Sequence, residues 1–428
     1  MRTRLTAFLT LAVIAAGCLT LSLLRGQDRA ATPATAPAAK APPAATPPAA
    51  PAKSGRDFSS LSPVQRQMLL SAQRGADWLF RMHRLKGRFV YGYLPALATE
   101  LEGDHYLRQA GAAFALARAA RFTGEERYAA RAAQALLALL DDTAPDANDA
   151  QVRYTALPPG VVNRLGAAGL LVAAINELPA PERDLLDKSE QLCNYIRRQA
   201  RPDGSLRLME GDAAPGDAEG AQLYPGEALY GLARSQKHRP AAWKLDLLRK
   251  AVAHYHPWWR AHKDMAFVPW QSAAWAEAYA LTGEKAFADC VLEMNDWLLN
   301  LQYAQLDGAD PRRLPWYGGF KGFADGRPVE SAPDVGAAAY AEALAEGCRV
   351  AQKAGDAERH RRYAEGLVRG LQFLTTLQYT EPNTQYFADW YRPRLAGAFH
   401  ASHQDGNLRI DYTQHAVSAL VLYLEYVK

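Results

Sequence analysis

Cysteine is scarce in this chain, which has four cysteines in 428 residues. They are Cys18, Cys193, Cys290 and Cys348. The wide spacing of the last three, and their odd number, exclude a disulfide framework and a cysteine-rich metal site. Each of these three lies in a segment with helical periodicity, where a small core residue is the expected role.

Clusters of like charge are also missing. Forty-nine Lys and Arg residues nearly balance 45 Asp and Glu residues, giving a formal net charge of +4. No basic block with interleaved aromatic residues occurs, so a nucleic-acid partner is not expected. No sequence pattern predicts a cofactor or a metal centre. The acidic segment Asp141–Gln151 lacks the spacing of an EF-hand, so we favour a solvated loop over a calcium site there.

One long uncharged apolar segment, Leu5–Leu24, follows Arg2 and Arg4. This pattern is typical of a bacterial export signal. Its length is sufficient for an uncleaved transmembrane anchor, whereas "AAGC" ending at Cys18 resembles a lipoprotein cleavage site, and simple cleavage is a third outcome. We expect residues 1–26 to direct the protein to the periplasm or cell envelope, tethered by a membrane anchor or by a lipid on Cys18.

Residues 27–55 consist mainly of Pro and Ala and contain no aromatic or large aliphatic side chain. Such a segment buries too little surface to fold, so we predict a disordered, extended linker. Residues 56–428 remain, and this length suits a single large domain.

The domain contains a repeated helical hairpin, in which an Ala- and Gly-rich helix is followed by a turn and a more polar helix. The five copies begin at Gly111, Gly166, Gly226, Gln271 and Gly336. Turns with the sequences "TGEERY" and "TGEKAF" recur, and Thr123 with Glu126 has the spacing of a capping box. Ser62 and Gln65 predict the start of a leading helix with Pro63 in its first turn.

A leading helix near residues 62–82 and a trailing helix from Asp411 would pair as a sixth hairpin and close a ring. The small residues of the first helices allow close approach, and "AVSALVLYLEYV" near the C-terminus is apolar on nearly every face, as a fully buried helix should be. We therefore predict an all-α fold, an (α/α)6 toroid with the Ala- and Gly-rich helices inside. An open α-solenoid is the alternative.

This hairpin layout resembles the alpha-toroid superfamily, which includes six-hairpin glycosidases, uronyl C5-epimerase catalytic domains, polysaccharide lyases and squalene-cyclase-like proteins. The resemblance covers residues 62–428. The segment "RRQARPDGSL" is similar to the Q…DG-x-W repeat of triterpene cyclases, with Leu206 in place of Trp, but no D-x-D-D motif accompanies it. The resemblance implies a carbohydrate-active protein whose site lies where loops enter the inner helices.

The segment "GNLRIDYTQHAVSALVLYLEYVK" places several polar side chains before its apolar helix. The spacing of Asp411 and Gln414 indicates a helix cap. Asp411 and Tyr412 also lie one helical turn before His415, so the two could serve it as an orienting acid and a neighbouring phenol. Such a group suits proton abstraction or cleavage of a glycosidic bond, and Arg409 suits a substrate carboxylate.

Other polar and aromatic residues precede or begin the inner helices and could line the same cleft. Glu227 is the further catalytic candidate, because hydrolysis needs two facing carboxylates and Glu227 could pair with Asp411. The candidates for substrate binding are Arg409, Tyr224, Trp270, Asp104, His105, Arg108 and Asp334; Asn163, Arg164, Gln271 and Glu330 lie in similar positions. Each of the carboxylates could instead be a helix cap or a dipole partner.

Together these patterns predict a membrane-tethered periplasmic protein that acts on an acidic or cell-envelope polysaccharide. Epimerase, lyase and hydrolase chemistries all fit the candidate residues. The alternative is a non-catalytic toroid that binds a glycan or serves as a scaffold in an envelope assembly. The sequence leaves the substrate and the oligomeric state open.

Overall fold

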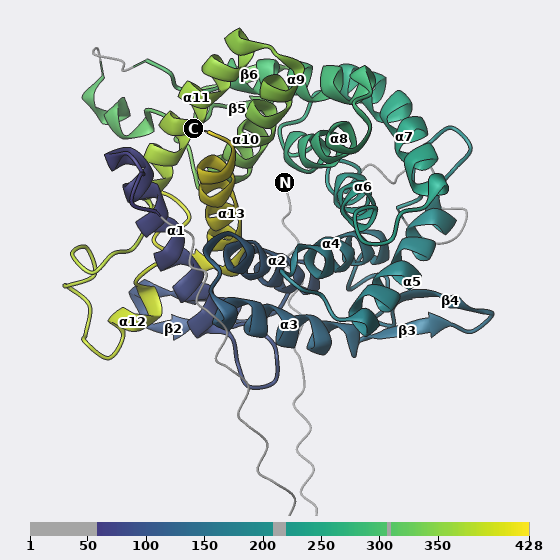
Figure 1. Cartoon of the computed structure of the whole chain (residues 1–428). Coiled ribbons are helices and arrows are strands. Elements are labelled where there is room, and N and C mark those ends of the chain that lie inside the picture. Colours follow the sequence, from purple (N-terminus) through teal and green to yellow (C-terminus); the bar gives the residue numbers. More distant parts are fainter. Residues whose placement is uncertain (1–57, 209–219, 306–309, 428) are drawn as a thin grey trace, which may run out of the picture. The chain divides into compact units, whose positions relative to one another are not determined.

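The computed structural model describes residues 58–208, 220–305 and 310–427 (Figure 1). The targeting segment and the linker predicted for residues 1–55 lie outside this part of the chain. Within the described residues, no helix is both long enough and apolar enough to span a bilayer.

Six helices form an inner ring in which each packs against the next and the last packs against the first (Figure 1). This closure confirms the toroid and excludes the open solenoid. The inner helices are α2 (Tyr106–Thr123), α4 (Arg164–Glu177), α6 (Tyr224–Ser235), α8 (Val268–Thr282), α10 (Ala337–Ala354) and α13 (Ile410–Tyr426).

Six further helices surround this ring, and all but one pack against the inner helix that precedes them in sequence. The exception is the leading helix, which packs against α13 and completes the sixth hairpin as predicted. The outer helices are α1 (Pro63–Met82), α3 (Glu126–Leu140), α5 (Arg183–Gln199), α7 (Ala242–Ala261), α9 (Lys285–Leu299) and α11 (Ala357–Thr376).

Residue size explains which helices lie inside. A Cβ at Gly169 of α4 would lie 2.5 Å from the Ala228 backbone nitrogen of α6, and one at Gly231 would lie 2.4 Å from the Gly169 oxygen. The two helices can therefore touch only because these positions lack side chains. An outer helix such as α5 buries a single stripe that includes Leu185, Leu192 and Ile196, as an amphipathic helix does.

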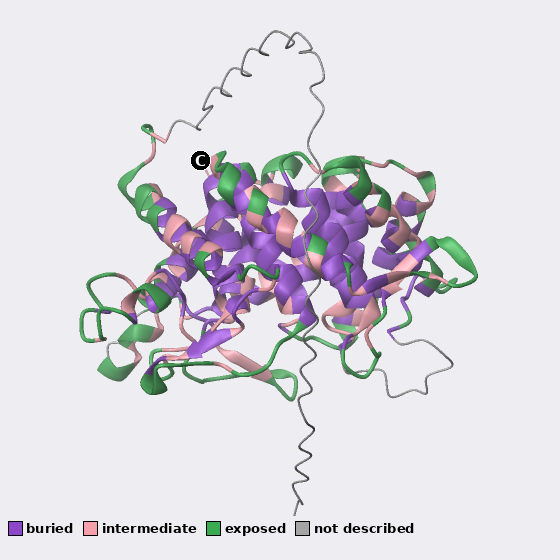
Figure 2. Ribbon diagram, turned by 90° about the horizontal axis from the view of Figure 1, so that it is seen from below, coloured by how far each residue is buried: buried purple, intermediate pink, exposed green. Residues whose placement is uncertain are grey.

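The two rims of the ring differ in their connections. Each of the first five inner helices joins its outer partner through a short turn, as at Gly124, Gly283 and Gly355, whose positive φ angles end the preceding helix. Most outer helices instead join the next inner helix through a long loop, such as residues 141–163, 300–336 and 377–409. The inner helices therefore all begin at the same loop-bearing rim, along the lower edge of Figure 2.

Short strands and helical turns stiffen this rim. The three-stranded sheet has the order β2-β1-β7, and two hairpins, β3–β4 and β5–β6, stand apart from it. Their bounds are β1 (Gly92–Leu94), β2 (Thr99–Glu100), β3 (Thr143–Asp146), β4 (Asp149–Thr155), β5 (Gly322–Ala324), β6 (Arg327–Val329) and β7 (Leu408–Arg409), with η1 (Pro95–Leu97), η2 (Pro311–Trp316) and α12 (Arg392–Leu395) between them. In the acidic β3–β4 hairpin, Asp146 and Asp149 both pair with Arg198 of α5.

The predicted caps have mixed outcomes. Ser62 and Gln65 form the expected capping box at the start of α1. The capping box predicted for Thr123 and Glu126 is wrong, because Glu125 is the N-cap of α3 and no side chain caps that helix. Thr123 instead belongs to the end of α2: its hydroxyl donates to the Ala119 carbonyl at 2.7 Å and accepts from the Glu125 N–H.

Near the short-turn rim, the ends of all six inner helices carry buried ion pairs, which we call the ionic belt. Its members are Arg118, Arg121, Glu177, Arg234, Glu277, Glu346, Arg349 and Glu425. Glu177 pairs with Arg118 at 3.3 Å, with Arg121 at 2.9 Å and with Arg234. Glu277 continues the belt to Arg349 at 3.0 Å.

Candidate functional site

A cavity of about 500 Å³ opens at the starts of the inner helices α10 and α13, among residues of the loops that precede them, and we call it the rim cavity. Its lining is Asp334, Val335, Gly336, Ala339, Ala401, Ser402, Asp405, Arg409, Asp411, Tyr412 and His415. The closing segment singled out in the sequence therefore supplies four of its polar side chains.

A second cavity of similar volume lies at the other rim, among α2, α3 and α5. Alanine and leucine make up much of its lining, and its carboxylates, Glu125, Glu126 and Glu182, are exposed to solvent. It contains no histidine and no buried carboxylate. For this reason we place the candidate chemistry in the rim cavity.

His415 lies in the second turn of α13 and is the central ionisable group of the rim cavity. Its Nδ1 lies 3.3 Å from Oε2 of Glu342 on α10, and its ring meets the edge of Trp270 on α8 at 6.0 Å between centroids. Burial lowers the pKa of His415, but the Glu342 carboxylate outweighs burial and holds the pKa above its ordinary value. The carboxylate that orients the imidazole thus belongs to Glu342 and not, as predicted from the sequence, to Asp411.

Glu227 lies in the first turn of α6, just after Pro225, and is 6% exposed. Its carboxyl group occupies space left by Gly166 of α4, since a Cβ there would lie 2.6 Å from Glu227 Oε2. Burial raises the pKa of Glu227 to about 8, partly offset by the charge of His415. At neutral pH this side chain is a carboxylic acid with a proton to donate.

Three buried polar groups near the starts of neighbouring inner helices have atoms without a hydrogen-bond partner among the described residues. They are Oε2 of Glu227, Oε1 of Glu342 and both side-chain amide atoms of Gln271. Buried polar atoms are nearly always paired in folded proteins, and exceptions call for a functional explanation. Hydroxyl groups of a bound ligand would supply such partners to the two carboxyl groups beside His415.

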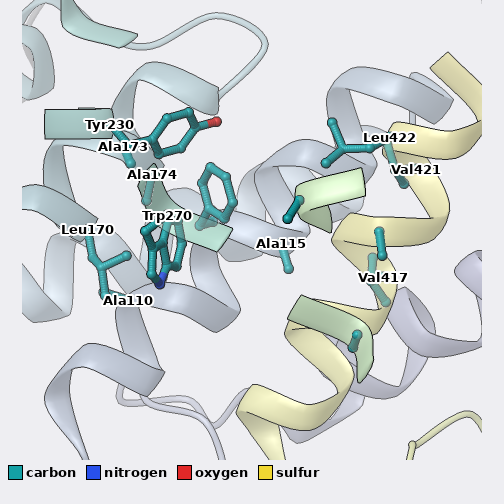
Figure 3. Close-up of a cluster of buried hydrophobic side chains, with 14 of the residues drawn as sticks. Ala110, Ala115, Leu170, Ala173, Ala174, Tyr230, Trp270, Val417, Val421 and Leu422 are labelled. Atoms are coloured by element: carbon teal, nitrogen blue, oxygen red, sulfur yellow. The ribbon is translucent and has the colours of Figure 1, made fainter. Parts of the chain in front are cut away.

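The floor of this region is aromatic. Trp270 of α8, Tyr230 of α6 and Phe114 of α2 pack with ring centroids 5.9 to 6.3 Å apart, and we call them the floor cluster (Figure 3). The hydroxyl of Tyr230 accepts a hydrogen bond from Arg118 of the ionic belt at 2.8 Å. The floor cluster therefore lies between the polar groups of the rim cavity and the ionic belt.

Arg409 and Asp411 form an ion pair with each other at the rim cavity. The guanidinium of Arg409 binds Asp411 through two hydrogen bonds of 2.6 and 2.8 Å and lies over the Tyr412 ring at 4.4 Å. Arg108 of α2 adds a second ion pair to Asp411 at 3.3 Å. The cap predicted for Asp411 is wrong: Arg409 is the N-cap of α13 and no side chain caps this helix.

A substitution distinguishes this ion pair from a cap. Asparagine caps helices as well as aspartate does, so a capping Asp411 would tolerate Asp411→Asn. Because Asp411 instead neutralises Arg108 and Arg409, we expect Asp411→Asn to lower the free energy of unfolding by about 1–2 kcal/mol. Chemical denaturation at low and high salt measures this loss, which salt should reduce. A variant as stable as the wild type would contradict the ion-pair role.

The remaining predicted residues divide into two groups. Asp334 lines the cavity, and its carboxylate accepts a hydrogen bond from the Gly336 N–H at 2.8 Å. His105 is the N-cap of α2, and burial, followed by the charge of Arg108, lowers its pKa. Tyr224 begins α6 beside Gly166. The other residues serve local structure: Asp104 binds Gln109, Asn163 caps α4, Arg164 lies over Tyr154, and Glu330 pairs with Arg313.

Glu342 is the residue that sequence analysis missed. It lies in "GAAAYAEALAEG", an inner helix where nearly every neighbour is small and apolar. An ionisable residue in a helix that must be buried on most faces needs a partner, and that pattern was the available signal. Glu342 and Glu346 share this signal, but only Glu342 meets His415, whereas Glu346 joins the ionic belt.

No protein-family model matches this chain, and no curated protein matches it in sequence. Solved structures do match it in fold. A cellobiose 2-epimerase from Bacillus thermoamylovorans B4167 superposes with a TM-score of 0.59 at 11% identity, over 85% of this chain and 98% of the epimerase. An alpha-1,6-mannanase from Salegentibacter sp. HEL1_6 gives 0.55 at 10% identity, over 84% of this chain and 100% of the mannanase.

An unsaturated glucuronyl hydrolase from Bacillus sp. GL1 gives a TM-score of 0.55 at 13% identity, over 83% of this chain and 96% of the hydrolase. These likenesses establish the (α/α)6 toroid fold. The three proteins perform different reactions, so the chemistry of this chain must be argued from its own residues.

Proposed function

We propose that this protein is a carbohydrate-active enzyme that transfers protons to and from a saccharide bound in the rim cavity. One observation carries the proposal: His415 of α13, which lines the rim cavity, contacts Glu342 of α10 and lies close enough to Glu227 of α6 to influence its pKa, and each glutamate has a carboxyl oxygen without a partner among the described residues. Similar folds that host an epimerase, a mannanase and a glucuronyl hydrolase support it by analogy.

Hydrolysis of a glycosidic bond is the reaction that these groups support best. It requires a carboxylic acid that protonates the leaving oxygen and a carboxylate that activates water. Glu227 suits the acid, because burial raises its pKa to about 8. Glu342 suits the base, with His415 fixing its orientation. The bond from the anomeric carbon to the linking oxygen breaks, water supplies the new oxygen, and the proton of water passes to Glu342.

Proton transfer at carbon is the second candidate, and the His415–Glu342 pair favours it. The His415 imidazole, whose pKa the Glu342 carboxylate helps to raise, is a stronger base than a free imidazole, and its unprotonated fraction can remove a proton next to a carbonyl or carboxylate group, as epimerase and lyase chemistries require. Burial raises the pKa of Tyr412, so its phenol remains a proton donor beside the cavity. Arg409 lines the cavity and could exchange its partner Asp411 for a substrate carboxylate, which is the basis for proposing an acidic glycan.

Isotope incorporation tests the proposal and separates the reactions. Neutral and uronate-containing oligosaccharides are incubated with the protein in water labelled with ¹⁸O and, separately, in D₂O. Hydrolysis places ¹⁸O on the new reducing end, epimerisation places deuterium on a sugar carbon, and a lyase gives an unsaturated product that absorbs ultraviolet light. Glu330→Gln, which removes an exposed carboxylate outside the rim cavity, is the matched control and should react normally.

Binding without turnover would instead identify a non-catalytic glycan-binding toroid, which is the alternative function. The absence of both binding and turnover for every neutral and uronate-containing oligosaccharide tested would overturn the proposal. The location in the periplasm or envelope is a separate proposal that rests on the predicted targeting segment, residues 1–26, and on the linker that follows it.

A further inference from the structure

The rim cavity opens at the loop-bearing rim, and this geometry restricts how a glycan can approach. We propose that the protein acts on the terminal residue of a glycan chain, which enters the rim cavity end-on, and that it does not act within the chain. The inference rests on the proposed function and adds to it which sugar of the substrate chain the protein acts on. Three structural features support it.

The first feature is the floor cluster. Phe114, Tyr230 and Trp270 come from three different inner helices and contact one another inside the ring; Figure 3 labels Tyr230 and Trp270. Phe114 and Tyr230 are almost completely buried, at 1% and 2% exposure. A ligand that reaches His415 therefore meets a wall of aromatic side chains and cannot extend through the ring.

The second feature is the ionic belt behind that floor. Arg118 pairs with Glu177 and also binds Tyr230 of the floor cluster. Arg118 is 4% exposed, Glu177 is 0% exposed and Glu277 is 1% exposed. Charged side chains lining an open channel would be hydrated, so the burial of these three supports a ring that is closed on the side of the short turns.

The third feature is the depth of the reactive groups. His415 and Glu342 are each the sixth residue of their helix, so they lie about 7–8 Å below the helix starts, at 1.5 Å of rise per residue. The cavity volume of about 500 Å³ is that of a pocket enclosing one compact ligand. A sugar in a chain interior has linkages on two sides, and both would have to leave through the same mouth.

A terminal sugar has only one linkage and avoids this conflict. Its free side can lie toward Trp270 of the floor cluster, which contacts His415, while the linkage to the next sugar points out of the cavity toward the loops. In the hydrolytic case the linkage beside Glu227 breaks and a single sugar unit is released. In the proton-transfer case the change is confined to that terminal unit.

The lengths of the first products test the inference. Linear neutral and uronate-containing hexasaccharides are incubated with the full-length protein, and mass spectrometry follows the products at early conversion. We expect a monosaccharide with a pentasaccharide, or a modified unit at one end. Disaccharides, trisaccharides and tetrasaccharides as first products, or modification of inner units, would overturn the inference but leave the proposed function intact. No turnover on any substrate would overturn both.

A pair of substitutions on one helix tests the direction of entry. Ala339, in the first turn of α10, lines the rim cavity, and Ala354, the last residue of α10, is exposed at the other rim. We expect Ala339→Trp to lower kcat/KM for the hexasaccharide by roughly 100-fold, because the indole displaces the sugar from the reacting groups. Ala354→Trp should leave kcat/KM unchanged.

Melting temperatures separate entry from folding in this pair. Both variants should melt within a few degrees of the wild type, since both positions are partly or fully exposed. Comparable loss of kcat/KM in the two variants, or full activity of Ala339→Trp, would contradict entry through the loop-bearing rim.

Discussion

Replacing Glu227 by glutamine is expected to reduce kcat by about 10²–10⁴-fold, which is the usual contribution of a positioned general acid. Burial raises the pKa of Glu227 to about 8, so the folded protein holds it as a neutral acid at pH 7. Glutamine has the same shape and charge as that acid but has no acidic proton. The substitution should therefore remove the chemistry and keep the packing beside Gly166.

Stability measurements on the same variant provide an independent readout. The pKa of Glu227 rises from 4.5 to about 8 on folding, so between these values the folded chain holds a proton that the unfolded chain releases. Stability due to this group is present below about pH 4.5 and is lost as pH rises through about 8. Glu227→Gln should lose this dependence and be more stable than the wild type at pH 8.

The wild-type pH profile should agree with this role. If Glu227 donates a proton, kcat/KM falls above about pH 8 as the carboxyl group ionises. A Glu227→Gln variant with nearly wild-type kcat would contradict the assignment. Loss of stability at pH 8 in that variant would show that Glu227 serves the fold as an ionised group.

Replacing Glu177 by glutamine is expected to lower the free energy of unfolding by about 3–5 kcal/mol, the cost of breaking a buried ion pair from one side. The carboxylate is fully buried and neutralises Arg118, Arg121 and Arg234. A neutral amide would leave these guanidinium groups without their shared counter-charge. Urea denaturation followed by circular dichroism measures the loss.

The matched control is Glu365→Gln on the outer helix α11, where the carboxylate pairs with Arg361 in solvent. Exposed pairs at this spacing contribute about 0.3–0.5 kcal/mol, so this variant should be nearly as stable as the wild type. Equal effects at Glu177 and Glu365 would show that the ionic belt does not stabilise the ring.

Acid should weaken the ionic belt in a defined pH range. Burial raises the pKa of Glu177, but the guanidinium groups, Arg234 and Arg118 foremost, outweigh burial and lower the pKa from 4.5 to about 2. The stability that Glu177 provides is therefore complete above about pH 4.5 and is lost as pH falls toward 2. Glu177→Gln should lack this part of the acid transition, which denaturation at a series of pH values would show.

Much of the candidate site could be predicted from the sequence, but its internal roles could not. Arg409, Asp411, Tyr412 and His415 line one cavity because they lie within two turns at the start of a single helix. The helix cap assigned to Asp411 depended on spacing within that segment alone. Arg108, which pairs with Asp411, comes from α2, and no local pattern connects the two.

The sequence by itself determined the ring. Its repeated Ala- and Gly-rich helices can approach one another only through small side chains, and the apolar face of α13 requires burial on all sides, so hairpin periodicity and residue size led to the toroid. Only the tertiary structure decided that Glu342 meets His415, that Glu227 is buried as an acid, and that the ionic belt joins the ends of the inner helices. These contacts join residues up to 304 positions apart, and their energies depend on distance and burial, which closure of the ring creates.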